Sequence, residues 1–286
     1  MKIDDYKVSI VIPTLNRIKT LPRAIESATN QSYKPSEVIV VDNGSTDGTL
    51  EFLKKEFPSI TILKEKKIGV STARNRGIKH SAFQWIALLD SDDAWKLNKL
   101  ERQINALKNS SIRYKLVHTD EIWIKNGKQF NQMKKHKKSG GNIFSKCLSL
   151  CCISPSSALI HKNLFNEIGY FDESLPVCED YDLWLKICSR ENVLFIDQKL
   201  TIKYGGHKDQ LSKKYWGMDR FRVKSIENLV LNSNLEASQK QKAVKSIIKK
   251  VKIIINGANK RNNSSIIEEY EKKLRFWENK LKNCFN

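Results

Sequence analysis

The sequence lacks the long apolar runs that membrane-spanning helices need, since no stretch reaches about 18 consecutive apolar residues. Its start, MKIDDYKVSI, leads directly into strand-like sequence without the apolar segment of a secretory signal peptide. The six cysteines include one adjacent pair, Cys151 and Cys152, but none of the Cys-x-x-Cys repeats that are typical of zinc sites. We therefore expect a cytoplasmic protein whose thiols are reduced and mostly buried.

Acidic residues are scarce relative to basic ones. The chain has 51 Lys and Arg against 31 Asp and Glu, which gives a formal net charge of +20. Residues 207–286 alone hold 19 basic and 8 acidic side chains, a net charge of +11. A field of this sign attracts nucleic acid, an anionic lipid surface or phosphate-bearing substrates, although lysine-rich helices are also simply well solvated.

The first hundred residues alternate between strand and helix patterns. Strands are expected within 7–14, 36–49, 60–65 and 84–90, and helices over 20–31, 47–57 and 70–81. Helices of this length between strands imply right-handed crossovers and a mainly parallel sheet. Ligands of such sheets bind outside the carboxyl ends of the strands, so the polar segments PTLNR, DNGSTDGT and DSDD should meet at one edge.

The rest of the chain is less regular. Residues 113–130 alternate like a hairpin around Asn126 and Gly127. Residues 156–192 read as strand, helix, turn and a second helix that starts near Glu179. Beyond about residue 215 the sequence is helical and basic. We expect one large α/β domain over 1–212 and a helical basic extension over 213–286.

Three carboxylates crowd the stretch LLDSDDAWK: Asp90, Asp92 and Asp93. Like charges at this spacing repel unless a cation lies among them, and carboxylate oxygens suit Mg²⁺ or Mn²⁺. A simpler interpretation is that Asp92 and Asp93 cap a helix over 94–107. Both hold if Asp93 caps the helix while Asp90 and Asp92 face the ligand.

Four segments carry a resemblance to a known family. VSIVIPTLNR, EVIVVDNGSTDGT, GVSTARNRGI and WIALLDSDD, in this order over residues 7–93, resemble the family 2 glycosyltransferases of the GT-A fold. The resemblance implies a Rossmann-like, mostly parallel sheet flanked by helices, here with a small basic helical appendage. It also implies an inverting, metal-dependent enzyme that moves a sugar from a nucleotide-diphosphate donor, most simply UDP-linked, to a hydroxyl of a glycan or lipid-linked acceptor, in cell-surface polysaccharide or glycoconjugate synthesis.

The same resemblance assigns the donor site. Asp42 would accept a hydrogen bond from the base, Asp90 would lie near the ribose, and Arg74 near the nucleotide or diphosphate. Asp92 would bind Mn²⁺ or Mg²⁺, which neutralises the diphosphate leaving group. The residues lining the nucleotide would be Pro13, Thr14 and Asn16.

Two later segments extend the resemblance. GYFDESLPVCEDYDLWLKI, residues 169–187, is similar to the family's second hallmark, which makes Asp180 the general base with Glu179 beside it. The alternative is that these acids only begin a helix. IKYGGHKDQLS is similar to the segment whose histidine, here His207, reaches the metal and diphosphate. Many relatives carry an arginine just before it, and Lys203 and Lys208 are the local substitutes.

Two other classes of protein remain as alternatives. A nucleotidyltransferase-like enzyme would explain the acids and the nucleotide site. A non-catalytic nucleic-acid-binding protein would explain the charge, but carboxylates at the ligand edge would repel phosphate, so we expect no nucleic acid. The basic tail and a Val and Ile face over 244–255 favour contact with an anionic glycan or peripheral contact with the inner face of the membrane.

Overall fold

A computed structural model describes residues 6–206 and 214–285. By their internal contacts these residues form two compact units. The first unit comprises the described parts of 1–141, 153–176 and 191–208, and the second those of 142–152, 177–190 and 209–286. The predicted boundary at 212/213 falls in the gap between the described ranges and stays a prediction.

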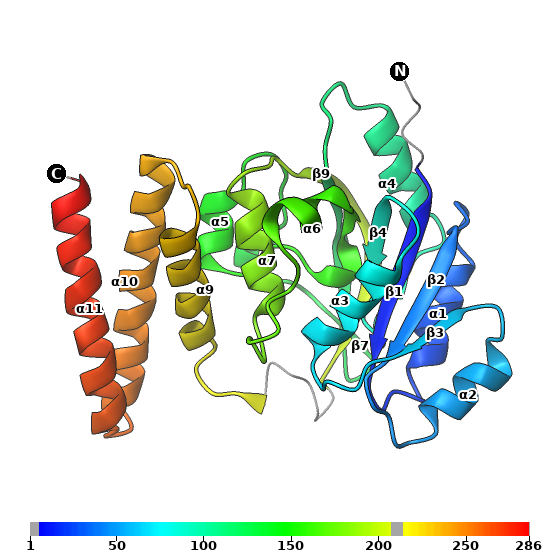
Figure 1. Cartoon of the computed structure of the whole chain (residues 1–286), viewed down its shortest axis with the longest axis horizontal. Coiled ribbons are helices and arrows are strands. Elements are labelled where there is room, and N and C mark those ends of the chain that lie inside the picture. The colour runs from blue at the N-terminus through cyan, green and yellow to red at the C-terminus, as the bar shows by residue number, and fades with distance from the viewer. Residues whose placement is uncertain (1–5, 207–213, 286) are drawn as a thin grey trace. The chain divides into compact units, whose positions relative to one another are not determined.

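The first unit begins with four parallel strands (Figure 1), which pair in the order β3-β2-β1-β4. The strands are β1 (Val8–Thr14), β2 (Glu37–Asp42), β3 (Thr61–Lys64) and β4 (Trp85–Leu88). The helices between them are α1 (Leu21–Thr29), α2 (Thr49–Glu56) and α3 (Val70–His80). The predicted alternation of strands and helices is confirmed, and so is the parallel sheet that it implies.

Beyond β4 the sheet becomes mixed, and it counts nine strands in the described residues. Four strands of the described chain continue the sheet beyond β4. They are β8 (Leu159–His161), antiparallel to β4; β6 (Leu116–Lys125), antiparallel to β8; β9 (Leu194–Gly205), parallel to β6; and β5 (Ala94–Trp95), antiparallel to β9. Because two antiparallel pairings separate them, β6 runs in the same direction as β4. The carboxyl ends of β6 and β9 therefore point toward the same edge as those of the parallel strands.

The predicted hairpin is also confirmed. β7 (Lys128–Phe130) pairs antiparallel with the end of β6. The two turn residues have φ angles of 51° at Asn126 and 76° at Gly127. Both lie in the left-handed region, as a two-residue turn whose twist matches its strands requires.

Apolar residues explain the order of the layers. All of β1 is buried on both faces, as a central parallel strand should be, and α1 covers it with Leu21, Ala24, Ile25 and Ala28. Helix α3 lies close to the strands at Gly77, where an added Cβ would stand 2.4 Å from Val11 Cγ1. The unit is completed by α4 (Lys99–Lys108), α6 (Asn163–Ile168) and the 3₁₀ turns η1 (Lys134–His136) and η2 (Pro155–Ser157).

The second unit is helical. It contains α5 (Phe144–Ser149), α7 (Glu179–Cys188), α9 (Met218–Asn232), α10 (Ala237–Asn259) and α11 (Ser264–Phe285), and α10 lies between α9 and α11 (Figure 1). The predicted face of α10 exists, but Val244, Ile247 and Val251 are buried within the unit. Among residues 6–206 and 214–285, none of the helices combines the length and apolar character of a membrane-spanning segment.

Candidate functional site

The loops after β1 and β2 are bound to each other at the carboxyl edge of the sheet. Thr14 and Asp42 pair in register as the last residues of their strands. Asn16, whose φ is 54°, accepts a hydrogen bond from the Thr46 amide at 2.8 Å and donates its own amide to Ser45 Oγ at 2.9 Å. The structure thus brings together Thr14, Asn16 and Asp42, and Pro13 precedes Thr14 in the same strand.

Two further predicted residues form an ion pair at this edge. Arg74, on α3, donates from Nη2 to Asp90 Oδ1 at 2.6 Å, and its side chain is only 4% exposed against 25% for Asp90. Burial alone would raise the pKa of Asp90, but the charges of Arg74 and Lys203 and the hydrogen bonds of Arg74 and Ser156 hold it below its usual value. Asp90 is therefore ionised, and Arg74 is fixed in position.

Asp93 does not cap a helix, so this prediction was wrong. Helix α4 begins only at Lys99 and is preceded by Asn98, because Ala94 and Trp95 pair with β9 instead of entering the helix. Asp93 is buried, and its carboxylate accepts hydrogen bonds from Ser156 Oγ at 2.6 Å and from the Tyr204 amide at 3.1 Å. Asp92 does not cap α4 either. Its carbonyl oxygen accepts a hydrogen bond from Arg23.

The charge state of Asp93 differs from that of Asp90. Burial, with the nearby charges of Asp92 and Asp90, raises the pKa of Asp93 well above its usual value, although Lys203 opposes the shift. Lys203 acts on the pKa values of three carboxyl groups, those of Asp90, Asp93 and Glu121. Arg74 and Lys203 are thus cations of the chain itself that reduce the repulsion in the acidic stretch.

The residues predicted to bind a metal are only partly described. Asp92 lies in the loop after β4, and His207 lies outside the described residues. Within residues 6–206 and 214–285 there is no group of three or more His, Cys, Asp and Glu side chains placed to hold a metal ion. A Mg²⁺ or Mn²⁺ ion that takes one or two carboxylates from the protein and the rest of its ligands from substrate phosphate and water needs no such group.

The candidate base belongs to the second unit. Asp180 is half-buried in the first turn of α7, where its Oδ2 accepts from Cys151 Sγ at 3.3 Å and its Oδ1 from the Tyr181 amide at 2.7 Å. Glu179 beside it is buried. Asp182 forms an ion pair with Lys186 at 2.6 Å. The roles of Asp180 and Glu179 stay predictions.

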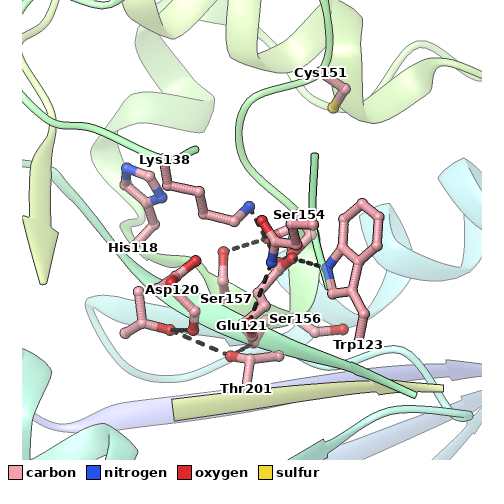
Figure 2. A network of polar contacts seen from close by, with 12 residues as sticks. His118, Asp120, Glu121, Trp123, Lys138, Cys151, Ser154, Ser156, Ser157 and Thr201 are labelled. Atoms are coloured by element: carbon pink, nitrogen blue, oxygen red, sulfur yellow. Dashed lines mark hydrogen bonds and ion pairs between the residues drawn. The ribbon is translucent and has the colours of Figure 1, made fainter. Parts of the chain in front are cut away.

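Sequence reasoning missed Ser154, Ser156 and their partners, and Figure 2 labels both serines with Glu121 and Thr201. Ser156 Oγ accepts from the Asp90 amide at 3.1 Å, and its carbonyl oxygen accepts from Trp95 Nε1 at 2.6 Å and Thr201 Oγ1 at 3.3 Å. Ser154 donates to the carboxylate of the buried Glu121. The only signal for these contacts is the Ser-rich segment ISPSS, residues 153–157, because hydroxyl groups favour turns.

The fold is that of the GT-A glycosyltransferases. The Staphylococcus aureus protein TarS, solved as its segment 1–349 in complex with UDP-GlcNAc, superposes with a TM-score of 0.66 at 17% sequence identity, over 94% of this chain and 91% of that one. Residues 9–169 match the family model described as Glycosyl transferase family 2. The chain belongs to this family, which favours glycosyl transfer over the nucleotidyltransferase and nucleic-acid-binding alternatives.

Curated relatives agree with this membership. The Escherichia coli enzyme UDP-Glc:alpha-D-GlcNAc-diphosphoundecaprenol beta-1,3-glucosyltransferase WfgD is 33% identical over 204 residues, which are 68% of this chain and 75% of that protein. An uncharacterized glycosyltransferase from Rickettsia bellii is 35% identical over 199 residues, 69% of this chain. The chain spans only 28% of that protein, and a third of the next two relatives.

Proposed function

We propose that the protein transfers a sugar from a UDP-sugar to a hydroxyl group of a glycan or lipid-linked acceptor, with inversion at the anomeric carbon, in the synthesis of a cell-surface polysaccharide or glycoconjugate. One observation carries the proposal. Asp42 at the end of β2, with Asn16 and Asp90 in the loops after β1 and β4, lies at the carboxyl edge of a parallel sheet, where α/β proteins bind nucleotides. The donor and acceptor in the name of WfgD and the UDP-GlcNAc bound to TarS support this choice of substrates.

In this proposal the strand-end residues bind the donor nucleotide. Asp42 accepts a hydrogen bond from the base, and Pro13, Thr14 and Asn16 line the nucleotide. Asp90, kept ionised by Arg74, accepts hydrogen bonds from the ribose hydroxyls. Because the ion pair already fixes Arg74, its remaining N–H groups are oriented before the nucleotide arrives.

Asp92 is the proposed ligand of Mn²⁺ or Mg²⁺, with His207 as the second protein ligand. The chemistry of the donor set fits, because a carboxylate oxygen on a strand-end loop is a hard ligand of the kind that these ions prefer. When bound, the ion would neutralise charge on the diphosphate leaving group.

Asp180 is the proposed general base. It removes the proton from the acceptor hydroxyl as that oxygen bonds to the anomeric carbon and the bond to the diphosphate breaks. The Cys151 thiol and the Tyr181 amide hydrogen-bond to its carboxylate and orient it. Cys178, at the start of the same helix, has a φ of 62°. A non-glycine residue in the left-handed region stores backbone strain, which is frequent at functional sites.

The proposal includes peripheral contact with the inner face of a membrane. The support is the net charge of +11 over residues 207–286. Because the Val and Ile face of α10 is buried in its own unit, the contact would be made by exposed lysines and not by apolar insertion.

Thermal unfolding with nucleotides tests the donor site. UDP with Mn²⁺ should raise the melting temperature by several degrees, since a ligand at 100 times its Kd adds about 2.7 kcal/mol of stability. GDP, CDP and UDP without metal should give smaller shifts. Asp92→Asn should remove most of the difference that Mn²⁺ makes. The donor site would be refuted if no nucleoside diphosphate stabilised the wild-type protein.

Replacement of the base tests the mechanism. Asp180→Asn should lower the rate of transfer by about 10²- to 10⁴-fold, because the acceptor proton loses its base. The Kd for UDP should stay at the wild-type value, which separates loss of the base from loss of the fold. Full transfer by Asp180→Asn would show that another group is the base.

A further inference from the structure

The first unit contains a pocket that is not lined by any of the proposed donor-site residues. It has a volume of about 340 Å³ and lies between the β6–β7 hairpin, the η1 segment and β9. This volume falls within the range of about 300–1,000 Å³ that is typical of small-molecule sites. Its wall includes the buried Glu121, whose network with Trp123, Lys138 and Ser154 is drawn in Figure 2.

The most buried polar side chain that lines the pocket is Glu121, whose carboxylate is held by several partners. Glu121 is 2% exposed and contacts Lys138 Nζ at 3.2 Å, Trp123 Nε1 at 2.8 Å and the Ser154 hydroxyl. Burial would raise the pKa of Glu121, but Lys138, Lys203 and the Trp123 hydrogen bond hold it below its usual value. The ionised carboxylate therefore fixes the Trp123 indole, and the C–H face of a sugar packs well on such an aromatic ring.

The rim of the pocket combines basic side chains with exposed apolar ones. Three lysines line it beyond the paired Lys138: Lys134, Lys137 and Lys199. They outnumber Asp120 and Asp197, the acids that line it besides Glu121. Two apolar side chains of the lining are also exposed, Phe130 by 48% and Met133 by 54%. A ligand that matches the rim has a negative charge and an apolar part.

The strand register puts this pocket at the same edge of the sheet as the donor-site residues. Leu116 of β6 and Ile86 of β4 both pair with Ile160 of β8. The two strands run in the same direction, and four residues further along the chain lie Asp120, within β6, and Asp90, two residues beyond the end of β4. The part of β6 that begins to line the pocket at Asp120 is therefore level with the acidic stretch after β4.

Electrostatic interactions and hydrogen bonds also connect the pocket with the acidic stretch after β4. Lys203 lowers the pKa of both Asp90 and Glu121. Ser154, directly before η2, donates to Glu121, and Ser156 within η2 donates to Asp93. The pocket thus shares Lys203 and the segment 154–156 with the acidic stretch after β4.

We propose that this pocket binds the acceptor, and that the acceptor is a saccharide with a phosphate next to its sugar ring and an apolar group beyond the phosphate. The sugar packs on Trp123, which Glu121 holds in place, the phosphate contacts the lysines of the rim, and the apolar group packs on Phe130 and Met133. This assignment rests on the proposed function, because it names the acceptor of the same reaction.

Three sets of probes separate the sources of affinity. The first set is the 1-phosphates of glucose, galactose and N-acetylglucosamine, which have the charge without the apolar group. The second set is the octyl glycosides of the same sugars, which have the apolar group without the charge. The third set carries the sugars on farnesyl diphosphate and has both. With the full-length protein, Kd values by titration calorimetry should be lowest in the third set for at least one sugar.

Paired variants test the two parts of the rim. The double variant Lys134→Ala/Lys137→Ala should raise the Kd of the first and third sets about tenfold and leave the octyl glycosides unchanged. Phe130→Ser/Met133→Ser should raise the Kd of the second and third sets only. Lys135→Ala is the matched control, because this exposed lysine belongs to η1 but does not line the pocket, and no Kd should change.

The outcomes distinguish this inference from the proposed function. If wild-type protein binds UDP with Mn²⁺ but none of the probes, the inference is overturned while the donor site stands. Wild-type affinity of the lysine double variant for the phosphate probes would also overturn it. If UDP does not bind at all, the proposed function itself fails.

Discussion

At the scale of single residues, the three carboxyl groups of the acidic stretch have different environments. Asp93 is almost fully buried, whereas Asp90 keeps a quarter of its side chain exposed and Asp92 keeps partial exposure. Asp93 accepts hydrogen bonds from Ser156 and Tyr204, whereas Asp90 is ion-paired with Arg74. Burial therefore dominates its pKa, and the charged form of Asp93 costs stability.

Replacing Asp93 should change how stability depends on pH. The folded-state pKa of Asp93 lies above the unfolded value of about 3.9. The contribution of the protonated Asp93 to the free energy of unfolding is therefore fully present below about pH 3.9, and it is lost as the pH rises through the folded-state pKa. Asp93→Asn removes this titration. Urea unfolding from pH 4 to 8 should show the free energy of unfolding of the variant improving relative to wild type as pH rises. A difference that stays constant over this range would contradict the prediction.

At the scale of elements, the contact of α3 with the sheet depends on Gly77. An added Cβ would meet Val11 Cγ1 at 2.4 Å and Val41 Cγ2 at 3.1 Å, and both valines belong to buried strands that have no space to move. Gly77→Ala should lower the free energy of unfolding by about 1–3 kcal/mol, because overpacking outweighs the helix propensity of alanine. Denaturant titration measures this loss.

Gly257 in α10 is the matched control. A Cβ there would meet only Arg261 Nη2 at 2.9 Å and Cζ at 3.8 Å, which are the far end of a flexible side chain. Gly257→Ala should be neutral or stabilising by up to about 1 kcal/mol, because alanine has the higher helix propensity. If both alanine variants destabilised equally, the tight contact at Gly77 would not be the cause.

The elements of the first ninety residues were predictable, whereas their continuation was not. Strand and helix periodicity is local, so 7–14 and 70–81 correspond closely to β1 and α3. The pairing of Ala94 with Ile202 joins residues that are far apart in sequence, and this pairing is the reason that the cap predicted for Asp93 was wrong. Long-range strand pairing leaves no periodic signal near the residues that it moves.

The candidate site follows the same division. Strand ends predicted that Asp42 and Asp90 would lie at one edge, and the structure has them there. The pairing of Arg74 with Asp90 and of Ser156 with Asp93 depends on how a helix and a 3₁₀ turn pack against those ends. Only the folded chain identifies such partners, because side-chain hydrogen bonds across 63 residues of sequence have no fixed spacing.

At the scale of the whole molecule, the net charge of +20 should govern association with surfaces. Basic side chains near an anionic leaflet contribute about 1 kcal/mol each, and salt screens the attraction. The protein should co-sediment with vesicles that contain phosphatidylglycerol at low ionic strength and be released at about 0.5 M salt. Vesicles of phosphatidylcholine alone are the control. Absence of binding to anionic vesicles at low salt would refute the proposed membrane contact.

The η2 turn has a consequence for how substrate preference can diverge. Ser156 of this turn donates to Asp93, and Ser154 directly before the turn donates to Glu121, so one short segment serves both the loop that follows β4 and the wall of the 340 Å³ pocket. The rim of that pocket comes from other parts of the chain, the β6–β7 hairpin and the residues that follow it. Exchange of the rim would leave these anchors intact, so under the proposed assignment one scaffold could be adapted to new acceptors while its donor end is inherited unchanged.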